Sequence, residues 1–126
     1  MANVPIDQLA AEITKAVREY TEDVTEAIEQ KVDEVADQVL EEVKRTAPKR
    51  TGKYRRGFVK TNRDEPGRVR RFVWNRRRYM LVHLLEFGHA KRGGGRVAAR
   101  PHLRPAYDKY VPRLIEEIRK IIKNGG

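Results

Sequence analysis

The first third of the chain carries an apolar pattern that repeats every eleven residues, and this repeat constrains the fold most. Aliphatic residues recur at this period in two series: Ile6, Val17, Ile28 and Val39, and Ile13, Val24 and Val35. An eleven-residue period corresponds to 3.67 residues per turn, so it predicts a long helix without the left-handed supercoil of a leucine zipper. From Pro5 to Val43 the helix would be roughly 58 Å long. We therefore expect part of it to project from its own domain or to pack against a neighbouring copy.

Charge divides the chain into two opposed parts. Residues 1–43 hold twelve acidic and three basic residues, a net charge of −9, whereas residues 44–126 have a net charge of +19. The overall net charge of +10 thus conceals an acidic helix joined to a basic remainder. Carboxylates at i, i+4 spacing repel one another along the helix: Glu29, Asp33, Asp37 and Glu41. This acidic row is either solvated or faced by basic residues of the same or an adjacent subunit.

The helix is followed by a loop and a predicted hairpin. Residues 46–58 contain a proline, two glycines and several basic residues, which predicts an extended basic loop. Two segments of strand length, 58–61 and 68–74, flank a turn-forming sequence and predict a β-hairpin. Both faces of the second strand mix apolar and basic residues, as in a sheet partly covered by helices or by another subunit.

The last third of the chain predicts two more helices. Residues 79–87 are almost wholly apolar and favour a short buried helix over a strand, with Gly88 as its end. Residues 91–100 contain three consecutive glycines and are expected to form a mobile loop in the free protein. An apolar stripe over residues 107–122 predicts a C-terminal helix. Pro112 interrupts this stripe, so we expect a kink or a fresh helix start there rather than an unbroken helix.

These elements predict a single α+β domain over residues 1–126, with a long acidic helix at 1–45 and a basic α+β portion at 46–126. We expect a long N-terminal helix, a small antiparallel β-sheet with a hairpin, a short middle helix, and a C-terminal helix packed on the sheet. There is no apolar run of membrane-spanning length and no signal-peptide pattern, so we expect a soluble protein made in the cytoplasm. The absence of cysteine excludes disulfides, thiolate nucleophiles and cysteine-based zinc sites.

Candidate chemistry is sparse. His83, Glu86 and His89 offer metal-ligand types, but their spacing differs from that of a zincin helix and Gly88 separates them. Glu86 is an acid in an apolar stretch, and we expect it to be buried as a structural ion pair with an arginine. No catalytic set or cofactor fingerprint stands out, so we predict no enzyme activity and no cofactor.

Arginines interleaved with aromatic residues make nucleic-acid binding the main alternative function. They are dense between residues 50 and 79, and such a patch binds phosphate non-specifically at low salt. Helix-turn-helix, zinc-finger and RNP-type motifs are absent from the sequence, and the acidic helix would compete with DNA. We therefore expect at most non-specific contact with DNA, and we keep an accessory nucleic-acid-binding role as the alternative.

Three spaced sequence blocks resemble a known family. They read A-P-x-x-T-G-x-Y-R-R-G-F at 47–58, L-E-F-G-H at 85–89 and A-R-P-H-L-R-P-A at 99–106. With the preceding long helix, they resemble the gene-ten-type tail-component family of long-tailed phages. The positions that match the family blocks are Pro48, Thr51, Gly52, Tyr79, Glu86, Gly88, Pro101, Leu103, Pro105 and Ala106. The chain departs from the family at Tyr54, His89 and His102, where leucine, threonine and phenylalanine are usual.

The resemblance implies a virion neck or tail-completion protein that is synthesised in the host cytoplasm and forms a ring at the head–tail junction. Its implied partners are copies of itself, a head-side connector and tail-side proteins. We expect the acidic row to meet the hairpin or the 49–56 loop, within or between subunits, and the 92–96 segment to order on docking. The interface candidates are Glu29, Asp33, Asp37, Glu41, Arg50, Arg55, Arg56, Arg92 and Arg96.

Overall fold

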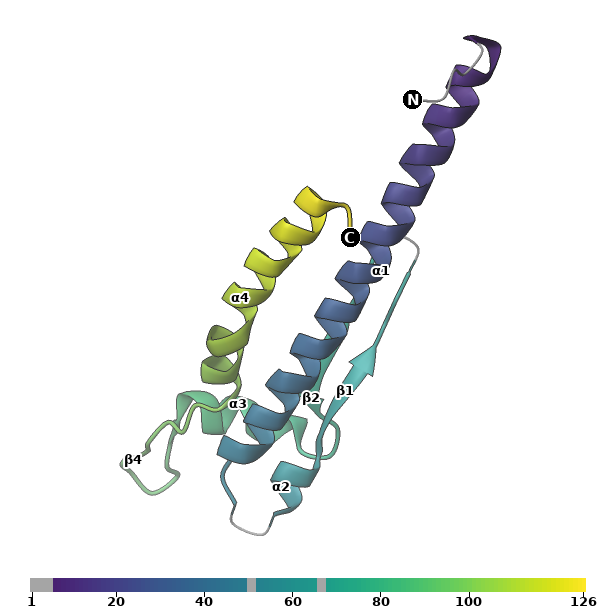
Figure 1. Cartoon of the computed structure of the whole chain (residues 1–126). Coiled ribbons are helices and arrows are strands. Elements are labelled where there is room, and N and C mark those ends of the chain that lie inside the picture. The colour runs from purple at the N-terminus through teal and green to yellow at the C-terminus, as the bar shows by residue number, and fades with distance from the viewer. Residues whose placement is uncertain (1–5, 50–51, 66–67) are drawn as a thin grey trace.

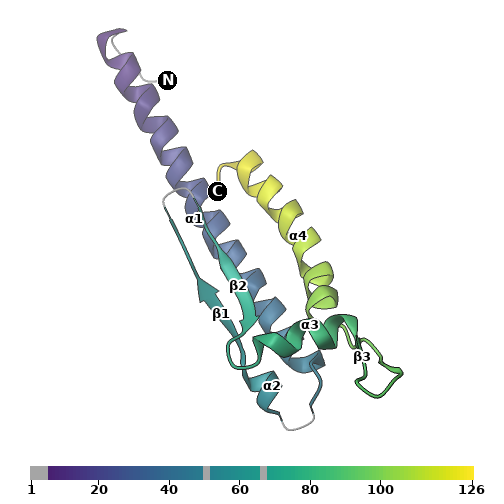
Figure 2. The same cartoon turned by 180° about the vertical axis from the view of Figure 1, so that it is seen from behind.

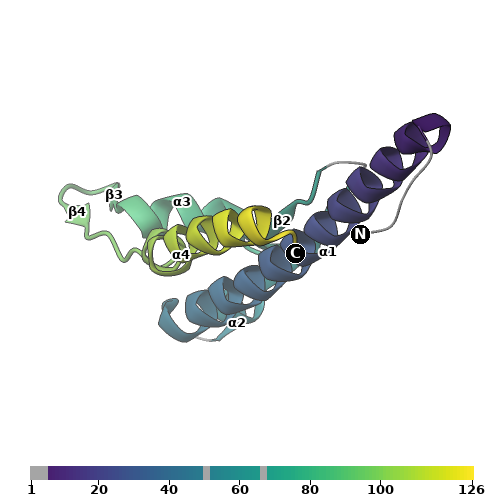
Figure 3. The same cartoon turned by 45° about the horizontal axis from the view of Figure 1, so that its top comes forward.

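A single long helix is the axis of the molecule (Figure 1). The computed structural model describes residues 6–49, 52–65 and 68–126. Helix α1 (Ile6–Thr46) has 41 residues, which confirms the helix predicted from the eleven-residue repeat. The other described elements gather along its C-terminal part, and its N-terminal end extends beyond them (Figures 1 and 3).

The hairpin lies against α1. After the one-turn helix α2 (Lys53–Arg56), strand β1 (Phe58–Asn62) pairs antiparallel with β2 (Arg71–Asn75), in the register Phe58 opposite Asn75. The predicted hairpin is therefore confirmed. Along β2, Arg71 and Val73 are partly covered, whereas Phe72 and Trp74 are exposed. Successive side chains of a strand point to opposite faces, so α1 covers one face of this sheet and leaves the other open.

Residues 79–87 form a helix, as predicted, but that helix is not buried. Helix α3 (Tyr79–Phe87) leaves Met80 74% exposed and Phe87 65% exposed. Only Glu86 is buried among its residues. The expectation of a buried helix is therefore wrong, because the described residues of this chain cover only one side of α3.

The glycine-rich segment forms a small hairpin. Strand β3 (His89–Ala90) pairs antiparallel with β4 (Arg96–Val97) around the three glycines. Gly88 joins α3 to this hairpin with φ of +71°, and a Cβ at that position would lie 2.5 Å from the carbonyl oxygen of Val97. Glycine is thus required here both by the backbone angle and by the lack of space. The expected mobility of this segment stays a prediction.

The C-terminal helix is continuous. Helix α4 (Leu103–Asn124) contains Pro112 in its interior, so the predicted fresh start at Pro112 is wrong. The helix packs along α1 (Figure 2), and this packing compensates for the hydrogen bond that proline cannot make. Near its end, the Tyr20 hydroxyl of α1 donates a hydrogen bond of 2.6 Å to the carbonyl of Ile122. The α+β architecture is confirmed, but α4 packs chiefly on α1 and not on the sheet as expected.

The core lies where α1, α2, β1 and α4 meet. Its buried members are Val35, Val39, Val43, Ala47, Tyr54, Phe58 and Ala106. Phe58 is fully buried, and its ring packs edge-on against the rings of Tyr54 and His102 at centroid distances of 5.0 and 5.7 Å. The contacts among these three rings hold α2 and the start of β1 against the start of α4.

We expect Phe58→Ala to lower the free energy of unfolding by about 3–5 kcal/mol, because it leaves a cavity among these rings. Urea denaturation followed by circular dichroism measures this loss. Phe72→Ala, on the open face of the same hairpin, is the matched control and should cost less than about 1 kcal/mol. Equal losses in the two variants would contradict the assignment of the core to the α1 side of the hairpin.

Candidate functional site

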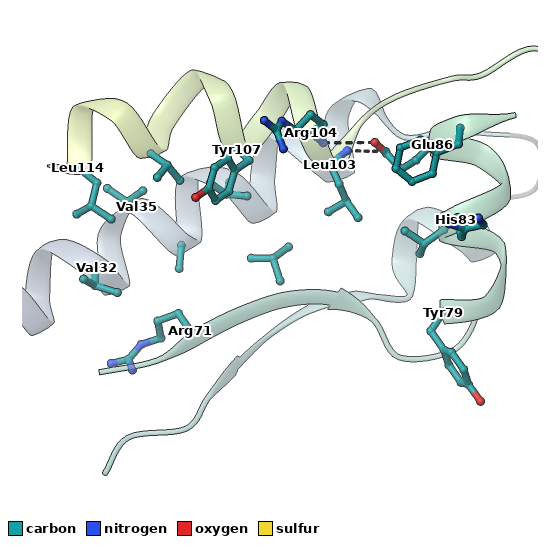
Figure 4. Close-up of a pocket in the computed structure, with 16 residues that line it drawn as sticks. Val32, Val35, Arg71, Tyr79, His83, Glu86, Leu103, Arg104, Tyr107 and Leu114 are labelled. Atoms are coloured by element: carbon teal, nitrogen blue, oxygen red, sulfur yellow. Dashed lines mark hydrogen bonds between the residues drawn. The ribbon is translucent and has the colours of Figure 1, made fainter. Parts of the chain in front are cut away.

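The second and third sequence blocks meet at one buried carboxylate. Glu86, near the end of α3, accepts a hydrogen bond of 2.6 Å from the backbone N–H group of His102. It also accepts hydrogen bonds from the backbone N–H groups of Leu103 at 2.7 Å and Arg104 at 3.4 Å (Figure 4). The first N–H groups of a helix have no partner inside the helix, and the helix dipole favours a negative charge there. Glu86 therefore caps α4 from another element. The expected ion pair with an arginine is wrong, because the helix N-terminus supplies the positive end.

His102 connects this carboxylate to the first sequence block. Its Nδ1 lies 2.9 Å from a Glu86 oxygen and 2.8 Å from the carbonyl of Arg100, so we assign the proton to Nδ1. Its Nε2 then accepts a hydrogen bond of 2.6 Å from the Tyr54 hydroxyl. Burial first, and the Glu86 carboxylate second, raise the pKa of Tyr54 above its usual value of 10.0. The tyrosine therefore stays a neutral donor.

The pairing of Tyr54 with His102 explains two departures from the family pattern. A leucine and a phenylalanine, which are usual at these positions, would meet through apolar contact alone. Here the two side chains share a hydrogen bond inside the core, and their rings are 5.4 Å apart in an edge-on arrangement. A buried polar atom needs a partner, so the two departures compensate for each other.

The remaining residues of the three sequence blocks differ in how far they are buried. Gly52 has a φ of +77° at the start of α2, Pro48 is half-buried after α1, and Ala106 is fully buried in the core. Leu103 is partly buried, whereas Tyr79, Pro101 and Pro105 are exposed, and Thr51 lies outside the described residues. Figure 4 shows the Tyr79 side chain directed away from Glu86. The structure therefore joins the blocks through Tyr54, Glu86, Gly88 and His102, and Tyr79 is not part of that junction.

The acidic row of α1 meets the hairpin of the same chain. Lys60 on β1 lies 2.7 Å from carboxylate oxygens of both Asp33 and Asp37. Arg71 on β2 is only 6% exposed and contacts Asp33 at 2.9 Å and Glu29 at 3.9 Å, as well as Asp64 in the turn. The row is thus faced by basic hairpin residues within the subunit. Whether its members also contact another subunit stays a prediction, as it does for the exposed Glu41.

These contacts shift the ionisation of the network. The hydrogen bonds from Lys60, and then from Arg71, lower the pKa of Asp33 below its usual 3.8. The hydrogen bond from Arg71 likewise lowers the pKa of Asp64. The carboxylates in turn raise the pKa values of Lys60 and Arg71. All four groups are therefore charged at neutral pH, and the arginine is held between α1 and the turn of the hairpin.

The basic interface candidates serve different purposes. Arg55 is half-buried, and its guanidinium donates hydrogen bonds to the carbonyls of Arg45 and Ala47, at the C-terminal end of α1. It thus neutralises the negative end of that helix from within the subunit. Arg56, Arg92 and Arg96 are exposed and stay predicted contacts. Arg50 lies outside the described residues.

Asn75 is buried and fixes the turn between β2 and α3, a role that no sequence motif had indicated. Its side chain donates to the carbonyl of Tyr54 at 2.7 Å and accepts from the backbone N–H groups of Arg77 and Arg78, just before α3. It leaves no room for a side chain at Gly57, where a Cβ would lie 2.3 Å from its amide oxygen. An asparagine directly after a strand is a common turn former, and that signal could have identified it.

An apolar pocket of about 910 Å³ lies between α1, β2, α3 and α4 (Figure 4). Its walls include Val35 and Val39 of α1, Val73 of β2, and Val82 of α3. Helix α4 contributes Leu103, Tyr107, Val111 and Leu114, and the polar lining residues are Arg71, His83, Glu86 and Arg104. Glu86 and Arg71 are occupied by the contacts above. The pocket thus presents chiefly apolar surface and suits the docking of a hydrophobic segment.

The described residues were also compared with what a metal site and a membrane-spanning helix require. Within residues 6–49, 52–65 and 68–126, no three histidine or acidic side chains are grouped so as to hold a metal ion. The described helices also include none that is both long and apolar enough to cross a bilayer. His83 instead packs against the ring of Phe87, at a centroid distance of 5.1 Å.

Glu86→Gln tests the cap of α4. The amide has one accepting oxygen and no charge, so we expect the free energy of unfolding to fall by roughly 1–3 kcal/mol in urea denaturation. The matched control is Glu116→Gln, which removes an exposed ion pair with Arg119 and should cost no more than about 1 kcal/mol. Equal effects would mean that Glu86 contributes no more than a surface charge.

Asp33→Asn tests the charge network through its pH dependence. A carboxylate whose pKa is lowered on folding stabilises the protein above its unfolded pKa, here near 3.8, and this stabilisation is lost as the pH falls through the folded value. We therefore expect the variant to have a lower urea midpoint than the wild type at pH 7. The difference should shrink below pH 3.8, and Glu22→Gln on exposed α1 should change the midpoint little. A difference that grows in acid would refute this assignment.

Comparison with known proteins supports the family resemblance, although the third sequence block, at residues 99–106, lies outside the matched range. No curated protein and no solved structure matches the chain significantly. One family model matches residues 11–88, more than half of the chain, and covers most of α1, the hairpin of β1 and β2, and α3. The protein therefore belongs to the family described as "Bacteriophage HK97-gp10, putative tail-component".

Proposed function

We propose that this phage tail component is a neck or tail-completion subunit that assembles as a ring at the head–tail junction. Its role is structural, and its partners are its own copies, a head-side connector and tail-side proteins of the virion. The proposal rests on family membership together with the apolar surface that the subunit leaves open.

The observation that carries the proposal is the amount of exposed apolar side chain on three elements. Large hydrophobic residues are exposed on the free end of α1, on the outer side of α3 and along α4, including Ile13, Met80, Phe87 and Ile115. Many exposed large apolar side chains on neighbouring turns of a helix are typical of subunit interfaces. An assembly that buries these faces accounts for them without invoking a small ligand.

Charge supports contacts between unlike surfaces. The carboxylates around Asp33 are neutralised by the hairpin of their own chain, whereas the N-terminal end of α1 keeps exposed acidic residues. The hairpin connection and the turn before α3 keep exposed arginines, among them Arg70 and residues 76–78. Contact between an acidic and a basic surface of adjacent copies is heterologous, and such contacts close into rings when the rotation permits.

Removal of the gene from the phage tests the proposal. We expect filled heads and finished tails that fail to join, because the joint between them lacks its subunit. Electron microscopy of lysates would show the two structures separately, and supplying the wild-type protein from a plasmid should restore joined particles. Normal, infectious particles from the deletion would rule out a joining role.

The open face of the hairpin favours non-specific DNA contact as a second candidate function. Phe72 and Trp74 are exposed there beside arginines, a combination that can hold phosphates and stack on bases. Fluorescence anisotropy with duplex DNA at increasing salt measures this binding. Binding that weakens steeply with salt and is lost in Arg70→Glu would favour this candidate, whereas equal binding by wild type and variant would count against it.

A further inference from the structure

The N-terminal end of α1 carries an apolar stripe that its own chain leaves uncovered. Leu9, Ile13 and Val17 follow one another at i, i+4 spacing and are 49%, 55% and 59% exposed. Every residue from 8 to 23 is exposed, and α4 ends where Tyr20 reaches Ile122. An isolated helical end of this length is only marginally stable in water. Packing against a partner outside its own subunit would bury the stripe and stabilise this end of the helix.

The pocket beside α4 is an open groove of matching character. Beyond the side that packs on α1, α4 has a second apolar face that includes Tyr107, Val111 and Ile115, of which the first two line the pocket. Figure 4 shows the Tyr107 side chain directed into the space between α4 and β2. The opposite walls come from β2 and α3 through Val73 and Val82. A helix placed there would lie between α4 and the hairpin.

The dimensions of stripe and groove agree. The groove follows α4 from Leu103 to Leu114, which is roughly 17 Å along the helix axis. The stripe from Leu9 to Val17 is roughly 12 Å long on the same basis. One apolar face of a helix laid in a groove is a common mode of recognition, with anchors at i, i+4 and i+7 or i+8. The pocket can therefore receive all three anchors at once.

Charge favours the acidic end of α1 over other apolar segments of the chain. On the helix, Glu12, Glu19 and Asp23 lie along one edge of the stripe, and residues 8–23 hold four acidic and two basic residues. The groove belongs to the basic part of the chain, and the exposed Arg104, which also pairs with Asp108 of the same helix at 3.2 Å, lines one end of it. The exposed face of α3, which is itself flanked by arginines at 76–78, would instead add positive charge to this basic part of the chain.

We propose that the stripe formed by Leu9, Ile13 and Val17 of one copy docks in the groove between α4, α3 and β2 of a second copy. Each subunit then offers one stripe and one groove, so the contact runs head to tail and leaves a free stripe and a free groove at the two ends of any open chain. Closure of such a chain produces a ring. This inference deepens the proposed function by naming the contact between copies, but its test does not depend on particles.

Cysteine cross-linking tests the contact directly, since the chain has no native cysteine. Full-length protein carrying Ile13→Cys is mixed with full-length protein carrying Tyr107→Cys or Val111→Cys, treated with a short bis-maleimide, and analysed by denaturing gel and mass spectrometry. The control replaces Ile13→Cys by Lys15→Cys, which lies on the opposite face of α1. Docking raises the effective concentration of the paired thiols, so we expect about tenfold more heterodimer than in the control. Equal yields, or no heterodimer, overturn the docking.

A complementation experiment supplies a second readout. Ile13→Asp disables the stripe and Tyr107→Asp disables the groove, and both positions are exposed enough for the fold to survive, which circular dichroism checks. In sedimentation, the wild type should form multimers, each variant should stay monomeric, and their equimolar mixture should give a one-to-one dimer. Variants that assemble like the wild type, or a mixture that stays monomeric, overturn the proposal.

The two proposals can fail separately. If deletion of the gene leaves heads and tails unjoined but the cross-link is absent, the protein is a joining component that assembles through another surface. If the cross-link forms but particles without the protein are normal, the copies do dock as described and the joining role is wrong.

Discussion

A buried carboxylate at the start of the C-terminal helix is the contact on which the rest of the structure depends. Glu86 satisfies the first N–H groups of α4, and so joins the end of α3 to the start of α4. Through His102 the same junction reaches Tyr54, and through the rings it reaches Phe58 at the start of β1. Breaking any one of these hydrogen bonds would leave a polar group unpaired in the core, which is costly. The contacts therefore stabilise one another. The sequence blocks thus meet at a structural junction.

The acidic residues in the middle of α1 are paired with basic residues of the hairpin, whereas the described ones at its N-terminal end are not. Arg71 and Lys60 neutralise the middle of the acidic helix and fasten the hairpin to it. The N-terminal end of the helix has no such counterpart within the described residues, and its apolar stripe is equally uncovered. The same helix therefore belongs to two environments. Its C-terminal part is one wall of the core, and its N-terminal part is exposed on the surface.

The departures from the family pattern show how a core can change without loss of architecture. A tyrosine and a histidine occupy two positions that are usually apolar, and each supplies the hydrogen-bond partner that the other requires. The phenol stays neutral because burial opposes its ionisation, so no unpaired charge enters the core. Such a pair is tolerated only as a pair, since either change alone would leave a buried polar atom without a partner.

The sequence by itself determined the three longer helices and the larger hairpin, because each of them has a local signature, whereas α2 and the β3–β4 hairpin were expected to be loops. The eleven-residue repeat specified α1, alternation and turn residues specified the hairpin, and the spaced blocks identified the family. Only the tertiary structure decided which groups of these elements contact one another. The sequence suggested an arginine partner for Glu86 and either a kink or a fresh helix start at Pro112. In the structure the N-terminus of α4 binds the carboxylate, and α4 runs through Pro112 without a fresh start while it packs on α1. The sequence also suggested burial for α3, whose apolar residues remain largely exposed. Partner choice depends on which groups meet in space, and local patterns carry no information about the other side of a contact.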